Sequence, residues 1–174
     1  MKYASSGAFR TALEQRLAAN ADGKPANYLN RHRKMIVFDR YLARLSAVAP
    51  GKWVLKGGIA LSLRLVERSR TTLDLDLASD LAENDVVDTL IDAADLELGD
   101  HFTFLVEKGV AFPAEERGEV LRFRLIATLA GRHFETVAID INLSEPLPKK
   151  TETVRASTFF DSQISRRSRY LQFR

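Results

Sequence analysis

The chain has 174 residues, of which 45% are hydrophobic and 28% are charged, as expected for one globular domain large enough to bury a core. It contains no cysteine, which excludes disulfide bonds and thiolate metal sites and fits a reducing cytosol. The N-terminal stretch MKYASSGAFR lacks the apolar core of a signal peptide, and no apolar run is long enough to cross a bilayer. We therefore expect a cytoplasmic protein with no membrane partner.

The net charge of +3 conceals a strong asymmetry along the chain. Residues 1–70 contain 14 Lys or Arg and 4 Asp or Glu, residues 71–148 contain 5 and 17, and residues 149–174 contain 7 and 2. A basic surface beside an acidic one attracts polyanions and binds cations. Charge runs are more often simply the solvated faces of helices, so both interpretations stay open at this point.

The apolar pattern predicts an α/β domain, a mixed sheet flanked by helices and preceded by two N-terminal helices. The first helix covers residues 5–20, with Ser5 or Ser6 as its N-cap, and the second covers residues 27–48, with the basic cluster RHRK at 31–34 on its exposed face. The other elements follow in order: strand 52–55, helix 59–67, strand 73–77, helix 81–96, and strands 103–108, 120–128 and 136–142, the last two joined by a hairpin at Gly131-Arg132.

Three segments are expected from this pattern. Residues 1–50 are N-terminal helices packed on the core, residues 51–148 are the α/β core, and residues 149–174 are a basic C-terminal tail. His32, His101 and His133 lie far apart without the spacing of metal ligands, so we predict no histidine metal site.

The stretch TTLDLDL places two carboxylates on the same side of a strand. Because side chains two residues apart in a strand point the same way, Asp74 and Asp76 project together, while Leu73, Leu75 and Leu77 face the opposite side. Two carboxylates so close repel each other unless a cation lies between them. Hard divalent cations with oxygen ligands, above all Mg²⁺, suit such a pair, although a lone Asp-x-Asp is more often incidental.

The pair Gly57-Gly58 precedes a helix on the same strand–turn–helix–strand unit. Glycine allows a sharp turn and a close approach of the backbone to a ligand, and the first turn of a helix directs free N–H groups at anions. Phosphate at the glycines and metal at the carboxylates would together hold a nucleoside triphosphate. The bland alternative is a tight turn. A Walker A loop is excluded, because Gly51-Lys52 is followed by Trp53.

The residues LKGGIALSLRL and RSRTTLDLDL resemble the nucleotidyltransferase superfamily pattern of a glycine pair at a helix start followed by an Asp-x-Asp strand. More closely, they are similar to the AbiEii/AbiGii-type nucleotidyltransferase toxins of bacterial abortive-infection and toxin–antitoxin systems. The flanking sequences FDRYLARLSAVAPGKWVLKGG and LRFRLIATLAGRHFETVAIDINLSEPL extend the resemblance to residues 8–148.

The resemblance implies roles for single residues. It places Asp74, Asp76 and the third carboxylate, Asp140, as catalytic ligands of Mg²⁺ (or Mn²⁺). It places the nucleotide at a further set, which comprises Lys56, Gly57, Gly58, Arg70 and Thr72. Two metal ions would then bind an NTP and activate an acceptor hydroxyl for attack on the α-phosphate. The implied acceptor is RNA, with the tRNA 3′ end expected, and the implied partner is a cognate antitoxin. Arg122 and Arg124 either neutralise phosphate or face solvent.

The family continues into a C-terminal helical domain that nothing after Pro148 matches, so this domain is expected to be absent. The face it would cover is then a candidate surface for a homodimer. Two alternatives to the toxin enzyme stay open. One is a catalytically weak or inactive core that binds an antitoxin or RNA. The other is a metal-dependent glycosyltransferase, which the single short strand upstream disfavours.

Overall fold

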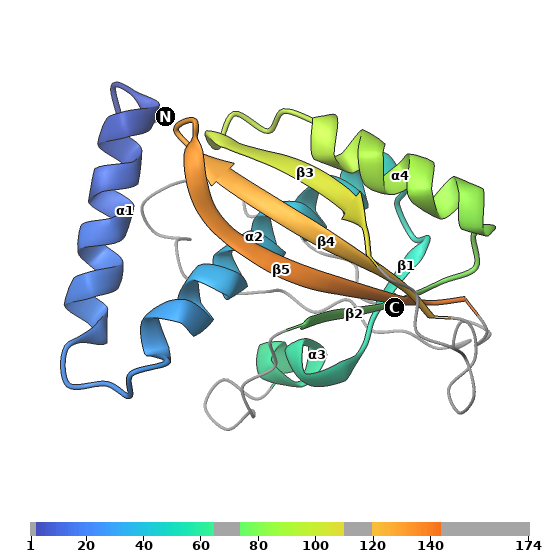
Figure 1. Ribbon diagram of the computed structural model, residues 1–174, viewed down its shortest axis with the longest axis horizontal. Coiled ribbons are helices and arrows are strands. Elements are labelled where there is room, and N and C mark those ends of the chain that lie inside the picture. Colours follow the sequence, from blue (N-terminus) through green and yellow to red (C-terminus); the bar gives the residue numbers. More distant parts are fainter. Residues whose placement is uncertain (1–2, 65–73, 110–119, 144–174) are drawn as a thin grey trace.

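A single mixed sheet of five strands carries the fold (Figure 1). The structure is a computed structural model, and it describes residues 3–64, 74–109 and 120–143. The helices are α1 (Ser6–Ala21), α2 (Tyr28–Val48), α3 (Gly57–Arg64) and α4 (Glu83–Asp95). The strands are β1 (Trp53–Leu55), β2 (Asp74–Ser79), β3 (Phe102–Lys108), β4 (Val120–Leu129) and β5 (Arg132–Asn142).

The strand order in the sheet is β1-β2-β5-β4-β3. Strands β2 and β5 pair in parallel, while β1–β2, β4–β5 and β3–β4 pair antiparallel. The predicted α/β class and order of elements are confirmed. Strand β5 begins earlier than predicted, because Ala130 and Gly131 both have positive φ values of 52° and 70° and make a tight turn. Pairing therefore starts at once, with Leu129 opposite Arg132.

Each of the central strands presents one buried and one more accessible side. In β4, Leu121, Phe123 and Leu125 are buried while Arg122 and Arg124 are not. The buried side belongs to one hydrophobic core that also includes the inner stripes of α1, α2 and α4. Figure 1 shows α2 crossing behind the sheet. Polar and charged residues of β2, β4 and β5 are therefore gathered on the side away from α2.

A buried arginine joins three elements of the core. Arg44 of α2 is 1% exposed, and its Nη2 and Nη1 donate to the two carboxylate oxygens of Asp100 at 2.7 and 2.9 Å. It also donates to the backbone carbonyls of Leu96, Arg40 and Phe102. A buried ion pair is tolerated only when its remaining donors are satisfied in this way. Arg44 thus fixes the end of α4 and the start of β3 against α2.

Helix α1 is stabilised by a local N-cap and by hydrogen bonds to a hairpin that is distant in the sequence. The predicted N-cap is confirmed as Ser5, whose Oγ accepts from the Ala8 backbone N–H at 3.2 Å. Arg10 donates to the carbonyls of Leu129, Arg132 and His133 at the β4–β5 hairpin. These bonds join α1 to the backbone of the hairpin.

The prediction that the RHRK cluster lies on an exposed face is wrong for Arg33. This side chain is partly buried, pairs with Glu14 of α1 and lies with its guanidinium carbon 5.5 Å from the centre of the Phe134 ring. The reason is that α1 packs beside α2 and covers this part of it. Within the ranges that the structure describes, no helix is long and apolar enough to cross a membrane. The predicted tail 149–174 lies outside the described residues.

Candidate active site

Strand β2 holds the two aspartates as the alternation predicts. Asp74 and Asp76 are partly accessible, whereas Leu75 and Leu77 are 0% and 2% exposed. The two leucines belong to the hydrophobic core. Burial of the leucines fixes the register of the strand, because a slip by one residue would bury both carboxylates. The core thus keeps the two acids on the accessible side.

The third predicted carboxylate lies beside this pair. In the parallel β2–β5 ladder Asp76 is opposite Asp140 and Asp74 is opposite Ala138. Side chains of directly opposed residues are neighbours on one face of a sheet. The structure therefore brings Asp74, Asp76 and Asp140 together on one face of the sheet from positions far apart in the sequence.

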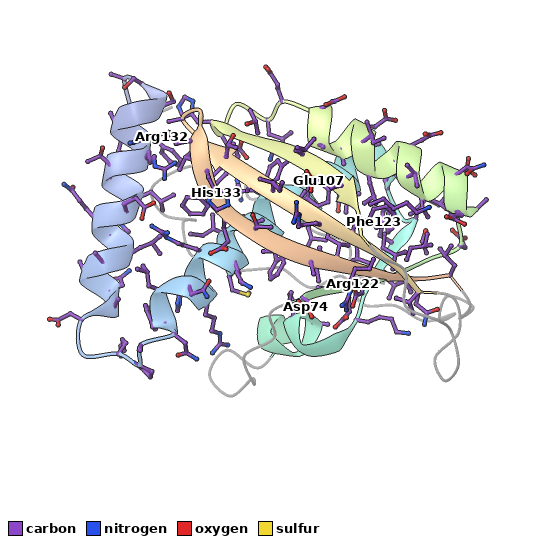
Figure 2. All side chains as sticks on the ribbon, in the orientation of Figure 1. Asp74, Glu107, Arg122, Phe123, Arg132 and His133 are labelled. Carbon is purple, nitrogen blue, oxygen red and sulfur yellow. The ribbon has the colours of Figure 1, made fainter. Side chains whose placement is uncertain are left out.

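Arg122 extends this row by one strand. It lies opposite Asp140 in the β4–β5 ladder, and its Nε donates to Asp140 Oδ1 at 2.6 Å while its Nη2 pairs with Oδ2. This is the two-pronged arrangement that arginine forms with carboxylates. Arg124 lies on the same face but pairs instead with Glu107 of β3. Figure 2 shows Arg122 and Asp74 at the end of the sheet that borders α3.

Gly57 brings the start of α3 against the carboxylate of Asp76. Its φ is +66°, and a Cβ atom at this position would lie 2.8 Å from Asp76 Cγ and closer still to Oδ2. The Lys56 backbone N–H donates to the carbonyl of Asp76 at 2.9 Å. A side chain here would be both strained and in collision. Glycine at 57 therefore avoids backbone strain and leaves the Asp76 carboxylate in its place.

The electrostatics of Asp76 follow from these neighbours. Burial raises the pKa of the Asp76 carboxyl above its ordinary value, and the charges of Asp140 and Asp74 raise it further, against the opposing effects of Arg122 and Lys56. Like charges held together raise one another's pKa when no cation neutralises them. Asp74, Asp76 and Asp140 form what we call the acidic face of the sheet. Its negative charge is one that a divalent cation would balance.

The residues best suited to bind a metal ion are the two aspartates of β2, Asp74 and Asp76. Carboxylate oxygens are the ligands that Mg²⁺ prefers, and Asp74 and Asp76 supply them from one anchored strand. Among the residues that the structure describes, however, no three acidic or imidazole side chains converge closely enough to form a metal site by themselves. The predicted three-ligand set including Asp140 stays a prediction.

Other predicted nucleotide contacts are placed only in part. Lys56, Gly57 and Gly58 lie at the junction of β1 and α3, next to Asp76. Arg70 and Thr72 lie outside the described residues. His32 Nδ1 lies 2.7 Å from the Tyr28 carbonyl and His133 Nε2 lies 2.9 Å from Thr136 Oγ1, whereas the buried Nε2 of His101 has no hydrogen-bond partner among the described residues.

Comparison with known proteins identifies the family. Residues 40–169 match the family model described as nucleotidyl transferase AbiEii toxin, type IV TA system. The chain belongs to the AbiEii nucleotidyltransferase toxin family. The match begins within α2, so it includes the whole sheet and the acidic face but not α1. The AbiEii resemblance predicted from the glycine pair and the Asp-x-Asp strand is confirmed.

The fold is also that of a solved structure. MenT4, a nucleotidyltransferase toxin from Mycobacterium tuberculosis H37Rv, superposes with a TM-score of 0.63 at 20% identity, over 91% of this chain and 53% of that one. JHP933 from Helicobacter pylori gives a TM-score of 0.43 at 18% identity, over 76% of this chain and 51% of that one. The chain thus spans about half the length of each of these proteins. No curated protein shows a significant match.

Two features of the site were not predicted from the sequence. One is the pairing of Arg122 with Asp140, and the other is the contact of Gly57 with Asp76. The alternation of RFR in one strand and DIN in the next indicates charged residues on a common face, but not their register. The tight turn at Ala130-Gly131 by itself would place Arg122 opposite Ile139, and the register shift between Ala127 and Thr128 moves its partner to Asp140.

Proposed function

We propose that this AbiEii-family chain is the catalytic core of a nucleotidyltransferase toxin that transfers a nucleotide from an NTP to an RNA acceptor, with the tRNA 3′ end as the expected site. One observation carries the proposal. Asp74 and Asp76 of β2 share one sheet face with Asp140 of β5, and Asp76 borders the glycine turn that begins α3. Family membership makes nucleotidyl transfer the first reaction to test.

In this proposal Asp74 and Asp76 hold a divalent cation, Mg²⁺ or Mn²⁺. When bound, that ion would neutralise the triphosphate and favour departure of pyrophosphate. The carboxylates act in their ionised form, so the raised pKa of Asp76 makes cation binding compete with protons. Lys56 and Arg122 contribute positive charge next to the same face. The N-terminal turn of α3 supplies backbone N–H groups suited to phosphate.

The activity is tested by transfer of radiolabelled NTPs to total tRNA in the presence of Mg²⁺. The four NTPs are compared for the wild type, for Asp74→Asn, and for Asp80→Asn as a matched control. Asp80 directly follows the same strand, but its side chain is exposed and its Oδ1 lies 3.7 Å from Lys52 Nζ. We expect label on RNA with the wild type and Asp80→Asn, and none with Asp74→Asn.

The same assay separates the proposed enzyme from a binding module. Mg²⁺-dependent NTP binding without transfer by a folded wild type would favour a core that binds RNA or antitoxin without turnover. Equal transfer by Asp74→Asn would exclude the acidic face as the site. The description of the family as a type IV toxin–antitoxin component makes a cognate antitoxin the first protein partner to test, by growth rescue on co-expression.

A homodimer remains part of the proposal for the accessible sheet face. Leu105 of β3 is 56% exposed and lies opposite Ile126 of β4 on that face. One charged pair borders this apolar spot, since Arg124 and Glu107 occupy the next row. Light scattering at rising protein concentration tests the dimer, and a mass of one chain throughout would exclude it.

A further inference from the structure

Arg122 lies at the β4 end of the acidic face, next to Asp140. Arg122 donates to both oxygens of Asp140, through Nε to Oδ1 at 2.6 Å and through Nη2 to Oδ2. A carboxylate held on both oxygens by a guanidinium is already neutralised. A second cation bound to the same carboxylate would lie close to the guanidinium and be repelled by it.

Close backbone contacts with Gly109 hold Arg122 in position. The Gly109 backbone N–H donates to the Arg122 carbonyl at 2.8 Å, and a Cβ at Gly109 would lie 3.2 Å from Arg122 Cγ and 2.9 Å from its carbonyl oxygen. The aliphatic part of Arg122 therefore passes close to a residue without a side chain. Two glycines thus border the row, Gly57 beside Asp76 and Gly109 beside Arg122.

The charges of the described row also favour a single ion. Asp74, Asp76 and Asp140 contribute three negative charges, and Arg122 and Lys56 act on Asp76 as two positive ones. The remaining charge is minus one, so one divalent cation more than balances it. A second divalent cation would leave the face strongly positive before any substrate arrived.

We propose that Arg122 is the fixed counter-cation of Asp140 and that the acidic face consequently holds one divalent cation, at Asp74 and Asp76, instead of two. This inference rests on the proposed function, since it assumes a cation at the β2 pair. It assigns Arg122 as a positioning residue, which keeps Asp140 in place and occupies the position of a second ion. It replaces the two-ion site that the family resemblance led us to expect.

The test is the number of Mn²⁺ ions bound per chain, measured by electron paramagnetic resonance of free Mn²⁺ without nucleotide, so that an ion carried by a triphosphate is not counted. We expect one ion for the wild type and two for Arg122→Gln, in which Asp140 is released. Arg124→Gln is the matched control, because Arg124 is two residues along the same strand and face but pairs with Glu107. It should bind one ion.

Further variants keep the result decisive. The double variant Arg122→Gln/Asp140→Asn should return to one ion. Arg122→Lys, which retains the charge, should also bind one, and Arg122→Met, which removes the charge but keeps an unbranched apolar side chain, should bind two if Arg122→Gln fails to fold. Two ions in the wild type, or one ion in a folded Arg122→Gln, would overturn the inference and leave the proposed function standing. No Mn²⁺ bound by the wild type, or binding that survives Asp74→Asn/Asp76→Asn, would overturn the β2 metal site as well.

Discussion

Replacement of Gly57 by alanine tests the contact between the start of α3 and the carboxylate of Asp76. Gly57 has a φ of +66°, which costs an L-amino acid about 1–2 kcal/mol. The added Cβ would also lie 2.8 Å from Asp76 Cγ, and such overpacking costs about a further 1–3 kcal/mol. We therefore expect Gly57→Ala to lower the free energy of unfolding by roughly 2–5 kcal/mol.

The chain provides a matched control for the backbone part of this cost. Gly131 has a φ of +70°, but an added Cβ there would meet nothing within 4 Å. Gly131→Ala should therefore lose only about 1–2 kcal/mol. The difference between the two variants, measured by urea unfolding followed by circular dichroism, isolates the displacement of Asp76.

A second readout connects the same substitution to the site. Because Asp76 must move to admit the new methyl group, Gly57→Ala should weaken Mn²⁺ binding, whereas Gly131→Ala should leave it unchanged. If the two variants lose equal stability and bind Mn²⁺ equally well, then Gly57 is an ordinary turn glycine and the reasoning is refuted.

Three further substitutions test the electrostatics and the core. The pKa of Asp76 is raised in the folded protein, so the folded state binds its proton more tightly than the unfolded chain does, and the ionised carboxylate destabilises the metal-free fold at neutral pH. Asp76→Asn should therefore raise the urea midpoint at neutral pH, with the gain fading as the pH falls through the raised pKa and gone below the ordinary value of 3.8; a gain that does not depend on pH would contradict this. Arg44→Met removes the ion-pair partner of Asp100, whose side chain is buried with 8% of the residue exposed. It should lower the free energy of unfolding by about 3–5 kcal/mol in the same assay, and a loss below about 1 kcal/mol would show that the pair is dispensable. Tyr41→Phe removes the 2.9 Å bond from the hydroxyl to the Leu90 carbonyl and should cost about 1 kcal/mol, measured as a lower melting temperature, so an unchanged one would disprove the bond's contribution.

Local patterns in the sequence predict most elements of this fold. The helical stripes, the alternating strands and the Ser5 cap follow from interactions between residues near one another in the chain. The same is true of Asp74 and Asp76, because their common side is set by the period of a strand. The family resemblance adds Asp140 to them.

The arrangement of the strands depends on distant contacts and could not be predicted in this way. Nothing local indicates that β5 lies between β2 and β4, and that position alone sets Asp140 beside Asp76 and Arg122 beside Asp140. The burial of Arg44 is a second case. An arginine within a helix predicts a solvated face, and only the fold brings Asp100 and the carbonyls of Leu96 and Phe102 to it.

The central place of β5 has a consequence for the order of events during synthesis. Strand β5 is the last element described along the chain, yet it forms the middle of the sheet. While the ribosome is still translating residues 132–142, β2 has only its β1 neighbour, and Asp74 and Asp76 are without Asp140 and Arg122. The acidic face is therefore completed only after β5 has emerged from the exit tunnel.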